Sequence, residues 1–205
     1  MEKQEQLGPY TLSIPEDVFP LGGDALALGR FASVRDGQRV CDLGTGSGAL
    51  LLLLAARSQN LSLFAIERDP YSAQTARKNL DQNNLPGTVH TGDLRHPPFP
   101  AGSFDLVVSN PPYFPVGSGK DGGPFRTEQF CTLEQLCQSA ARLLRNGGRF
   151  ALCHRPDRMV DVLCSLRAQG LEPKRLKLVS HGPGHSPFLL LVEAMRQGKP
   201  GLQVE

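Results

Sequence analysis

Residues 40–48 read Val-Cys-Asp-Leu-Gly-Thr-Gly-Ser-Gly, a short apolar run that passes directly into a glycine-rich turn. About sixty residues later, residues 109–114 read Ser-Asn-Pro-Pro-Tyr-Phe at the end of a second apolar run. Glycine tolerates positive φ and lets a ligand approach the backbone closely. Ligands of open parallel sheets bind beyond the carboxyl ends of the strands. The two segments therefore predict one ligand site built from two strand ends.

Outward from these segments, short apolar runs alternate with segments of helical period. The pattern predicts strands at 40–43, 61–67, 88–93, 104–109 and 149–154. It predicts helices at 25–32, 49–57, 71–83, 132–144 and 156–169. Two last strands, 174–180 and 188–195, are expected to be antiparallel neighbours at the sheet edge. This alternation is typical of a doubly wound α/β fold with a mostly parallel sheet.

Length and composition favour one ordinary domain. A chain of 205 residues is long enough to bury a substantial core. It contains no apolar run of the length that a membrane span needs, and its first residues lack a signal-peptide pattern. The five cysteines show no C-x-x-C spacing, which favours reduced thiols over a structural zinc site. We therefore expect a cytoplasmic protein without a membrane anchor or a metal.

The charge is unevenly distributed along the chain. Residues 1–137 carry 11 Lys and Arg against 15 Asp and Glu, a balance of −4, and residues 138–205 carry 11 against 5, a balance of +6. A basic C-terminal third suits a polyanionic partner such as RNA. The alternative is that these charges lie on the solvated faces of surface helices and an edge strand.

The glycine-rich turn and the Asn-Pro-Pro-Tyr segment together resemble one group of class I S-adenosylmethionine-dependent methyltransferases, over roughly residues 20–195. The resemblance implies a Rossmann-like sheet of seven strands, mostly parallel with one antiparallel edge strand. It implies S-adenosylmethionine as cofactor and S-adenosylhomocysteine as product. The G-x-G-x-G spacing differs from the G-x-G-x-x-G of dinucleotide sites. We expect one domain over 1–205, with a cofactor-covering helix in 1–39, a catalytic core in 40–195 and a tail in 196–205.

The resemblance also implies the donor-binding residues, which are Asp24, Asp42, Gly44, Gly46, Gly48, Glu67, Asp93, Leu94 and Asn110. Glu67 would accept hydrogen bonds from the ribose hydroxyls, and Asp42 would lie near the amino group of the donor. Asp93 would accept from the adenine amino group, alongside the backbone of Leu94. Asp24 would help to close over the cofactor. The alternatives are that Glu67 and Asp93 are strand-end or capping carboxylates and that Asp24 is a helix N-cap.

The Asn-Pro-Pro-Tyr segment suits methyl transfer to a planar nitrogen. Two acceptors, the Asn110 side-chain oxygen and the Pro111 carbonyl, would bind the two amine hydrogens and direct the nitrogen lone pair at the methyl group. Adjacent prolines stiffen the turn because they fix φ and have no backbone donor. The expected catalytic residues are Asn110, Pro111, Pro112 and Tyr113. The expected substrate contacts are Tyr113, on which a base can stack, Phe114 and Arg126.

The segment does not by itself distinguish the acceptor. Within the resembled group, enzymes that methylate adenine N6 in tRNA, the anticodon-loop region of valine tRNA in particular, share the Gly-Asp element at 23–24 and Phe114. The alternative is a glutamine N5-methyltransferase that acts on release factors, although those enzymes carry a helical domain before the glycine-rich turn and only 39 residues precede Val40. A further alternative is a non-catalytic subunit that binds S-adenosylmethionine or RNA. We expect a tRNA partner, and the sequence leaves the choice between monomer and homodimer open.

Overall fold

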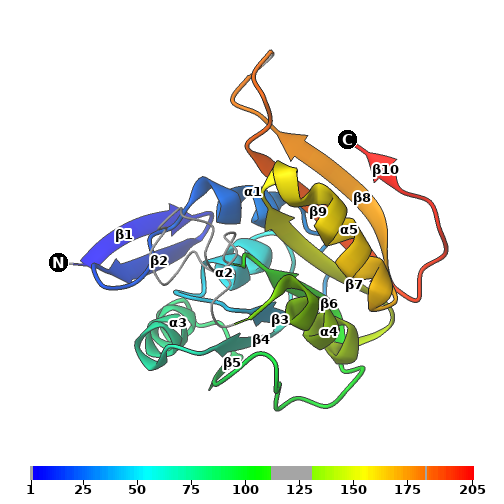
Figure 1. Cartoon of the computed structure of the whole chain (residues 1–205). Coiled ribbons are helices and arrows are strands. Elements are labelled where there is room, and N and C mark those ends of the chain that lie inside the picture. The colour runs from blue at the N-terminus through cyan, green and yellow to red at the C-terminus, as the bar shows by residue number, and fades with distance from the viewer. Residues whose placement is uncertain (1, 112–130, 183) are drawn as a thin grey trace.

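The computed structural model describes residues 2–111, 131–182 and 184–205, and these form a large central sheet covered by helices on both faces (Figure 1). The strands are β1 (Glu2–Leu7), β2 (Tyr10–Pro15), β3 (Arg39–Leu43), β4 (Ser62–Glu67), β5 (Gly87–Thr91), β6 (Phe104–Ser109), β7 (Leu144–His154), β8 (Leu171–Val179), β9 (Leu189–Arg196) and β10 (Gln203–Val204). The helices are α1 (Gly23–Phe31), α2 (Ala49–Ala55), α3 (Pro70–Gln82), α4 (Leu133–Leu143), the 3₁₀ turn η1 (Pro156–Arg158) and α5 (Met159–Ala168).

Within the described residues the central sheet has eight strands in the order β10-β8-β9-β7-β6-β3-β4-β5. Strands β7, β6, β3, β4 and β5 are parallel to one another, and β9 is antiparallel to both β7 and β8. This confirms the doubly wound, mostly parallel class. The last two long strands, β8 and β9, are antiparallel neighbours as expected. The expected edge position of the antiparallel strand and the expected number of seven strands were wrong, because β9 lies between β7 and β8 and the described sheet has eight strands. After β7 the chain crosses over through α5 and forms β8 two strand positions away from β7. It then turns back, and β9 fills the position between β7 and β8.

Two buried clusters cover the two faces of this sheet. One cluster includes buried residues of α1, α2 and α3, such as Leu28, Leu52 and Leu80. The other includes buried residues of α4 and α5, such as Leu136 and Leu166. Each helix therefore buries one apolar stripe against the sheet, which is how a three-layer α/β domain forms its core.

An N-terminal hairpin, β1 with β2, was not expected from the sequence, because β1 is mostly polar and exposed. Two asparagines of α3 attach the hairpin. Asn79 Oδ1 accepts from the Ser13 N–H at 2.9 Å, and Asn83 Oδ1 accepts from the Thr11 N–H at 2.9 Å. Asn79 is almost fully buried, so these bonds satisfy an amide that would otherwise be costly to bury.

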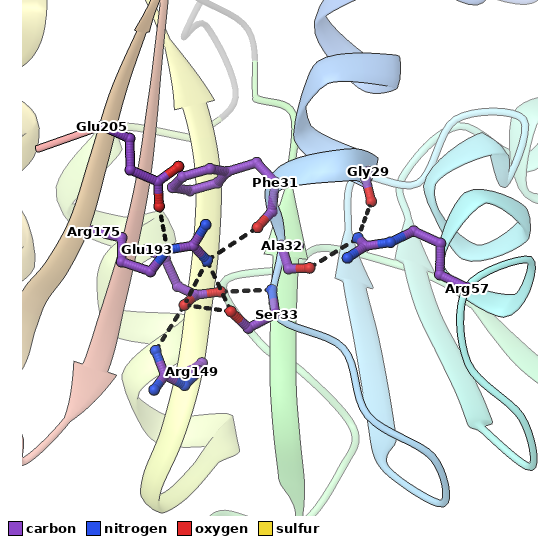
Figure 2. A network of polar contacts seen from close by, with 9 residues as sticks. All are labelled: Gly29, Phe31, Ala32, Ser33, Arg57, Arg149, Arg175, Glu193 and Glu205. Carbon is purple, nitrogen blue, oxygen red and sulfur yellow. Dashed lines mark hydrogen bonds and ion pairs between the residues drawn. The ribbon is translucent and has the colours of Figure 1, made fainter. Parts of the chain in front are cut away.

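A polar network around Glu193 of β9 ties the end of α1 to the sheet (Figure 2). Glu193 is fully buried, and its carboxylate accepts from the N–H of Ser33 at 2.7 Å and from the hydroxyl of Ser33 at 2.9 Å. Arg149 Nη1 donates to Glu193 Oε1 at 2.7 Å, and Arg175 Nη1 donates to the Phe31 carbonyl at 3.2 Å. The residues that follow α1 are thereby fixed to β7, β8 and β9.

Candidate active site

A cavity of about 710 Å³ opens beyond the carboxyl ends of β3, β4, β6 and β7. Strand order reverses at β3, because the chain continues to β4 and β5 on one side and later to β6 and β7 on the other. Such a reversal is where open parallel sheets bind their ligands. Eight of the expected site residues line the cavity: Asp24, Gly44, Gly46, Glu67, Asp93, Leu94, Asn110 and Pro111. Pro112, Tyr113, Phe114 and Arg126 lie outside the described residues.

The three glycines of the turn after β3 have different structural roles. Gly44 and Gly46 have φ of 77° and 55°, and a Cβ at either position would meet nothing within 4 Å. Gly48 has φ of 85°, but a Cβ there would lie 3.3 Å from the Cβ of Ala76 in α3. Gly48 is not among the residues that line the cavity, and it allows close packing of α2 on α3. Gly44 and Gly46 are thus the two glycines whose missing side chains leave space at the site.

Asp42 is a residue of β3 and is not among the residues that line the cavity. Its side chain is fully buried, and Oδ2 accepts from the hydroxyl of Thr45 at 2.7 Å. Oδ1 is buried without a hydrogen-bond partner in the described part of the chain. Burial raises the pKa of Asp42 to about 7, with a smaller contribution from the charge of Glu67. A buried carboxylate oxygen without a donor is a costly group unless a ligand, a cation or a water satisfies it.

Glu67 is held against the glycine-rich turn. Its Oε2 accepts from the N–H of Gly46 at 2.8 Å, and its Oε1 accepts from the N–H of Asp69 at 2.9 Å. Because an ionised carboxylate has about four acceptor sites, both oxygens retain capacity toward the cavity. Glu67 therefore lies at the end of β4 as expected, and its carboxylate is held in a fixed position in the cavity wall.

Asp93 follows β5 and carries a partner of its own. Arg95 Nε donates to Asp93 Oδ2 at 2.8 Å, and the Arg95 N–H donates to Oδ1 at 2.9 Å. The hydrogen bond from the Arg95 side chain lowers the pKa of Asp93, so its carboxylate is ionised at neutral pH. Asp93 lines the cavity together with Leu94, and Arg95 fixes its orientation.

Asn110 lies at the end of β6, where the strand enters the cavity wall. The preceding residue, Ser109, is buried and donates its hydroxyl to the carbonyl of Leu43 at 2.7 Å, which joins the ends of β6 and β3. The thiol of Cys153, fully buried in β7, donates to Asn110 Oδ1 at 3.0 Å. These contacts orient Asn110 from the two neighbouring strands β3 and β7. Cys153 was not predicted from the sequence, because it lies in an apolar strand and belongs to no recognisable motif.

His154 and Arg155, at the end of β7, also line the cavity. The Arg155 N–H donates to His154 Nδ1 at 2.9 Å, so the neutral imidazole carries its proton on Nε2. Burial, with Arg158 nearby, lowers the pKa of His154 to about 4. His154 is therefore neutral at physiological pH and contributes a dipole rather than a charge.

Helix α1 contributes Asp24 and Ala25 to the cavity wall. The N-cap of α1 is Gly22, so Asp24 lies within the first turn and is not the capping residue. A carboxylate in a first turn complements the helix dipole. Asp24 thus faces the cavity from an end of α1 that is opposite to the end fixed by Glu193.

None of the helices in the described ranges combines the length and apolar character that crossing a membrane requires. In the same ranges, no three side chains among His, Cys, Asp and Glu gather into a group suited to a metal ion.

The chain is similar in sequence to bacterial proteins named tRNA1(Val) (adenine(37)-N6)-methyltransferase. It is 33% identical over 183 residues to the one from Tolumonas auensis, which covers 86% of this chain and 76% of that protein. It is 28% identical over 144 residues to the one from a Flavobacteriaceae bacterium, which covers 70% of this chain and 62% of that protein. The matched region therefore spans less than two thirds of the flavobacterial relative.

Solved structures agree on the fold. A "predicted O-methyltransferase" from Agrobacterium tumefaciens superposes with a TM-score of 0.72 at 22% identity, over 89% of this chain and 85% of that one. This likeness confirms the methyltransferase fold that the two motifs led us to expect. A family model described as "Methyltransferase small domain" matches residues 23–163, from the start of α1 into α5. That range contains all the described residues of the predicted site, and the chain belongs to the methyltransferase small domain family.

Proposed function

We propose that this protein transfers a methyl group from S-adenosylmethionine to the exocyclic N6 of an adenine in tRNA. The observation that carries the proposal is the placement of Asn110 and Pro111 in the same cavity as Glu67 and Asp93. The names of the bacterial relatives support tRNA as the substrate, with adenine 37 of a valine tRNA as the first target to test.

The residues present fit the proposed donor. Gly44 and Gly46 leave the turn open, and Asp42 has a buried oxygen for which a cationic amino group, directly or through water, is a suitable partner. We assign the ribose hydroxyls to Glu67 and the adenine amino group to Asp93 with the Leu94 backbone, which is supported by the presence of these residues in the cavity wall. When bound, S-adenosylmethionine supplies an electrophilic methyl group on a sulfonium.

The acceptor side needs geometry rather than a base. The lone pair of an adenine amine is delocalised into the ring, so the nitrogen must become pyramidal before it can attack. Asn110 Oδ1 and the Pro111 carbonyl are the two acceptors that we assign to its hydrogens. Cys153 positions Asn110 through its thiol. The ammonium formed by transfer loses its proton readily, and holding the reactants in line provides most of the acceleration.

We further propose that residues 1–205 act as one domain, with a covering segment in 1–39, a core in 40–195 and a tail in 196–205. Pro112, Tyr113, Phe114 and Arg126 remain the proposed contacts to the flipped base and its neighbours. A tRNA-modifying role is consistent with a cytoplasmic location.

Donor affinity should rise with pH through about 7. Asp42 has a folded-state pKa of about 7 against an ordinary value near 4, so donor-free protein takes up a proton there as it folds. The contribution of Asp42 to the folding stability of the donor-free protein is therefore fully present below about pH 4, and it is lost as the pH rises towards 7. A cationic amino group favours the carboxylate, so binding releases that proton, and affinity should improve by at most about tenfold per pH unit below 7.

Calorimetric titration with S-adenosylmethionine between pH 5.5 and 7.5 measures this slope. Asp42→Asn should bind more weakly at pH 7.5 and with a flatter pH dependence. Thr45→Val removes the hydroxyl that bonds Asp42 and lowers its pKa, so this variant should keep the pH dependence and move it to higher pH. An unchanged slope in Asp42→Asn would mean that another group titrates.

The function is tested by incubating the full chain with isotopically labelled S-adenosylmethionine and unmodified bulk tRNA, followed by digestion and mass spectrometry of the nucleosides. The expected product is labelled N6-methyladenosine. Donor binding without any label in RNA, and with label in a release-factor substrate, would replace the proposal with the glutamine reaction. Donor binding without transfer to either would favour a non-catalytic subunit.

A further inference from the structure

Figure 1 shows the chain between β8 and β9 extending beyond the end of β8. Because β9 is antiparallel to both β7 and β8, β8 runs in the same direction as β7, and its end lies on the side of the sheet where the cavity opens. Strand β9 pairs antiparallel with β7 so that Leu190 lies opposite His154, a residue of the cavity wall. Phe188 comes just before β9, and its N–H donates to the carbonyl of Val179 at 2.9 Å. The backbone of Phe188 is therefore fixed at the mouth of the cavity by the end of the sheet.

Phe188 presents an exposed aromatic ring at this mouth. Its ring stacks on that of His181, with 4.3 Å between the ring centroids and 12° between the ring planes. Phe188 is 40% exposed and lines the cavity, as does Phe19, which is 38% exposed. Exposing a phenylalanine ring to water is unfavourable, and the stack on His181 limits the orientations that the ring can take.

Apart from Asp24, Glu67 and Asp93, which we assign to the donor, and Asp69, which caps α3, the charged side chains that line this cavity are cationic. Arg68 and Arg155 line the same cavity, and residues 138–205, which contain Phe188, carry a balance of +6. Aromatic faces beside guanidinium groups are the combination that binds single-stranded nucleic acid, since bases stack on the rings and phosphates bind the cations. Two separate rings offer too little apolar area for a stable protein–protein interface.

We propose that Phe188, stacked on His181, binds an unpaired nucleobase of single-stranded RNA that neighbours the base entering the cavity, with Arg155 contacting the adjoining phosphate. This rests on the proposed function, because it assigns a second nucleotide to the same substrate. The site is distinct from the Asn-Pro-Pro-Tyr segment, which we assign to the target base itself.

The test is fluorescence anisotropy of a labelled RNA stem-loop with an unpaired adenine-containing loop, titrated with the full chain in the presence of S-adenosylhomocysteine. Phe188→Ala should weaken binding by about tenfold, within the range that loss of one base–aromatic stack produces. Phe188→Tyr keeps the ring and should bind like the wild type. His181→Ala should cause a smaller loss, because the backbone of Phe188 stays fixed.

Val160→Ala is the matched control, because Val160 is an apolar residue of α5 that is 68% exposed and outside the cavity lining. Equal RNA binding by Phe188→Ala and Phe188→Tyr would overturn the proposal. An equal loss of S-adenosylhomocysteine affinity in Phe188→Ala, measured by calorimetry, would also overturn it and assign the ring to the donor pocket. The proposal would also be overturned if Phe188→Ala bound a release-factor substrate more weakly than the wild type but bound RNA equally well.

The outcomes separate this inference from the proposed function. If wild-type protein methylates tRNA and Phe188→Ala binds RNA normally, the stacking site fails and the function stands. If the ring-dependent RNA binding is found but no N6-methyladenosine forms, the function fails and the stacking site stands.

Discussion

Asn110→Ala should lower kcat for methyl transfer by about 10²–10³-fold, the loss that follows removal of one positioned polar group at a reacting centre. The amine acquires its nucleophilic lone pair only while both hydrogens are accepted, and alanine removes one of the two acceptors. The affinity for S-adenosylmethionine should change little, since Glu67 and Asp93 are assigned to the donor and remain in place. Single-turnover transfer to tRNA and calorimetric donor binding measure the two quantities separately.

The control is Asn146→Ala, which removes an exposed asparagine near the start of β7. It should leave both quantities unchanged. A second variant, Cys153→Ala, removes the thiol donor to Asn110 Oδ1 and should reduce kcat less than Asn110→Ala does. If Asn110→Ala loses donor affinity in the same proportion as kcat, Asn110 serves the donor pocket rather than the acceptor.

The sequence predicted the parallel part of the sheet well, because strands and crossover helices leave local patterns. The expected strand 104–109 coincides with β6, and the expected helices 71–83 and 132–144 differ from α3 and α4 by one residue at each end. Local chemistry explains this accuracy. Asp69 caps α3 by accepting from the Ser72 N–H at 2.7 Å, and Thr132 forms a capping box with Gln135.

Features that depend on distant pairing were not visible in the sequence. The position of β9 depends on which strands it joins, and its apolar run is equally compatible with an edge position. The role of Gly48 depends on Ala76, which comes from another helix. Cys153 and Phe188 reach the site only because β7 and β9 pair with His154 opposite Leu190. The motif residues were predictable because each follows a strand of the parallel sheet, and the carboxyl ends of parallel strands lie on the same side of the sheet.

Glu193→Ala should destabilise the fold by about 3 kcal/mol, near the lower end of the cost of breaking a buried ion pair. Glu193 is fully buried, and its loss leaves Arg149 and Arg175 without their shared carboxylate and the Ser33 N–H without its acceptor. The cost stays near the lower end because the side chains of Arg149 and Arg175 keep 27% and 25% of their surface exposed, so that water solvates them in part. For a chain of this size the midpoint of thermal unfolding should fall by about 6–12 °C.

Urea unfolding of the donor-free protein measures the change, with an unchanged m value as evidence that the unfolded state is the same. Asp161→Ala is the control, because it breaks an ion pair to Arg158 in which the carboxylate is 58% exposed and should cost less than about 1 kcal/mol. Glu193→Gln retains an acceptor for Ser33 and should lie between the two. Equal stability of Glu193→Ala and Asp161→Ala would contradict the assignment of α1 anchoring to this network, since the Glu193 carboxylate is buried and shared by two arginines and Ser33, whereas that of Asp161 is exposed.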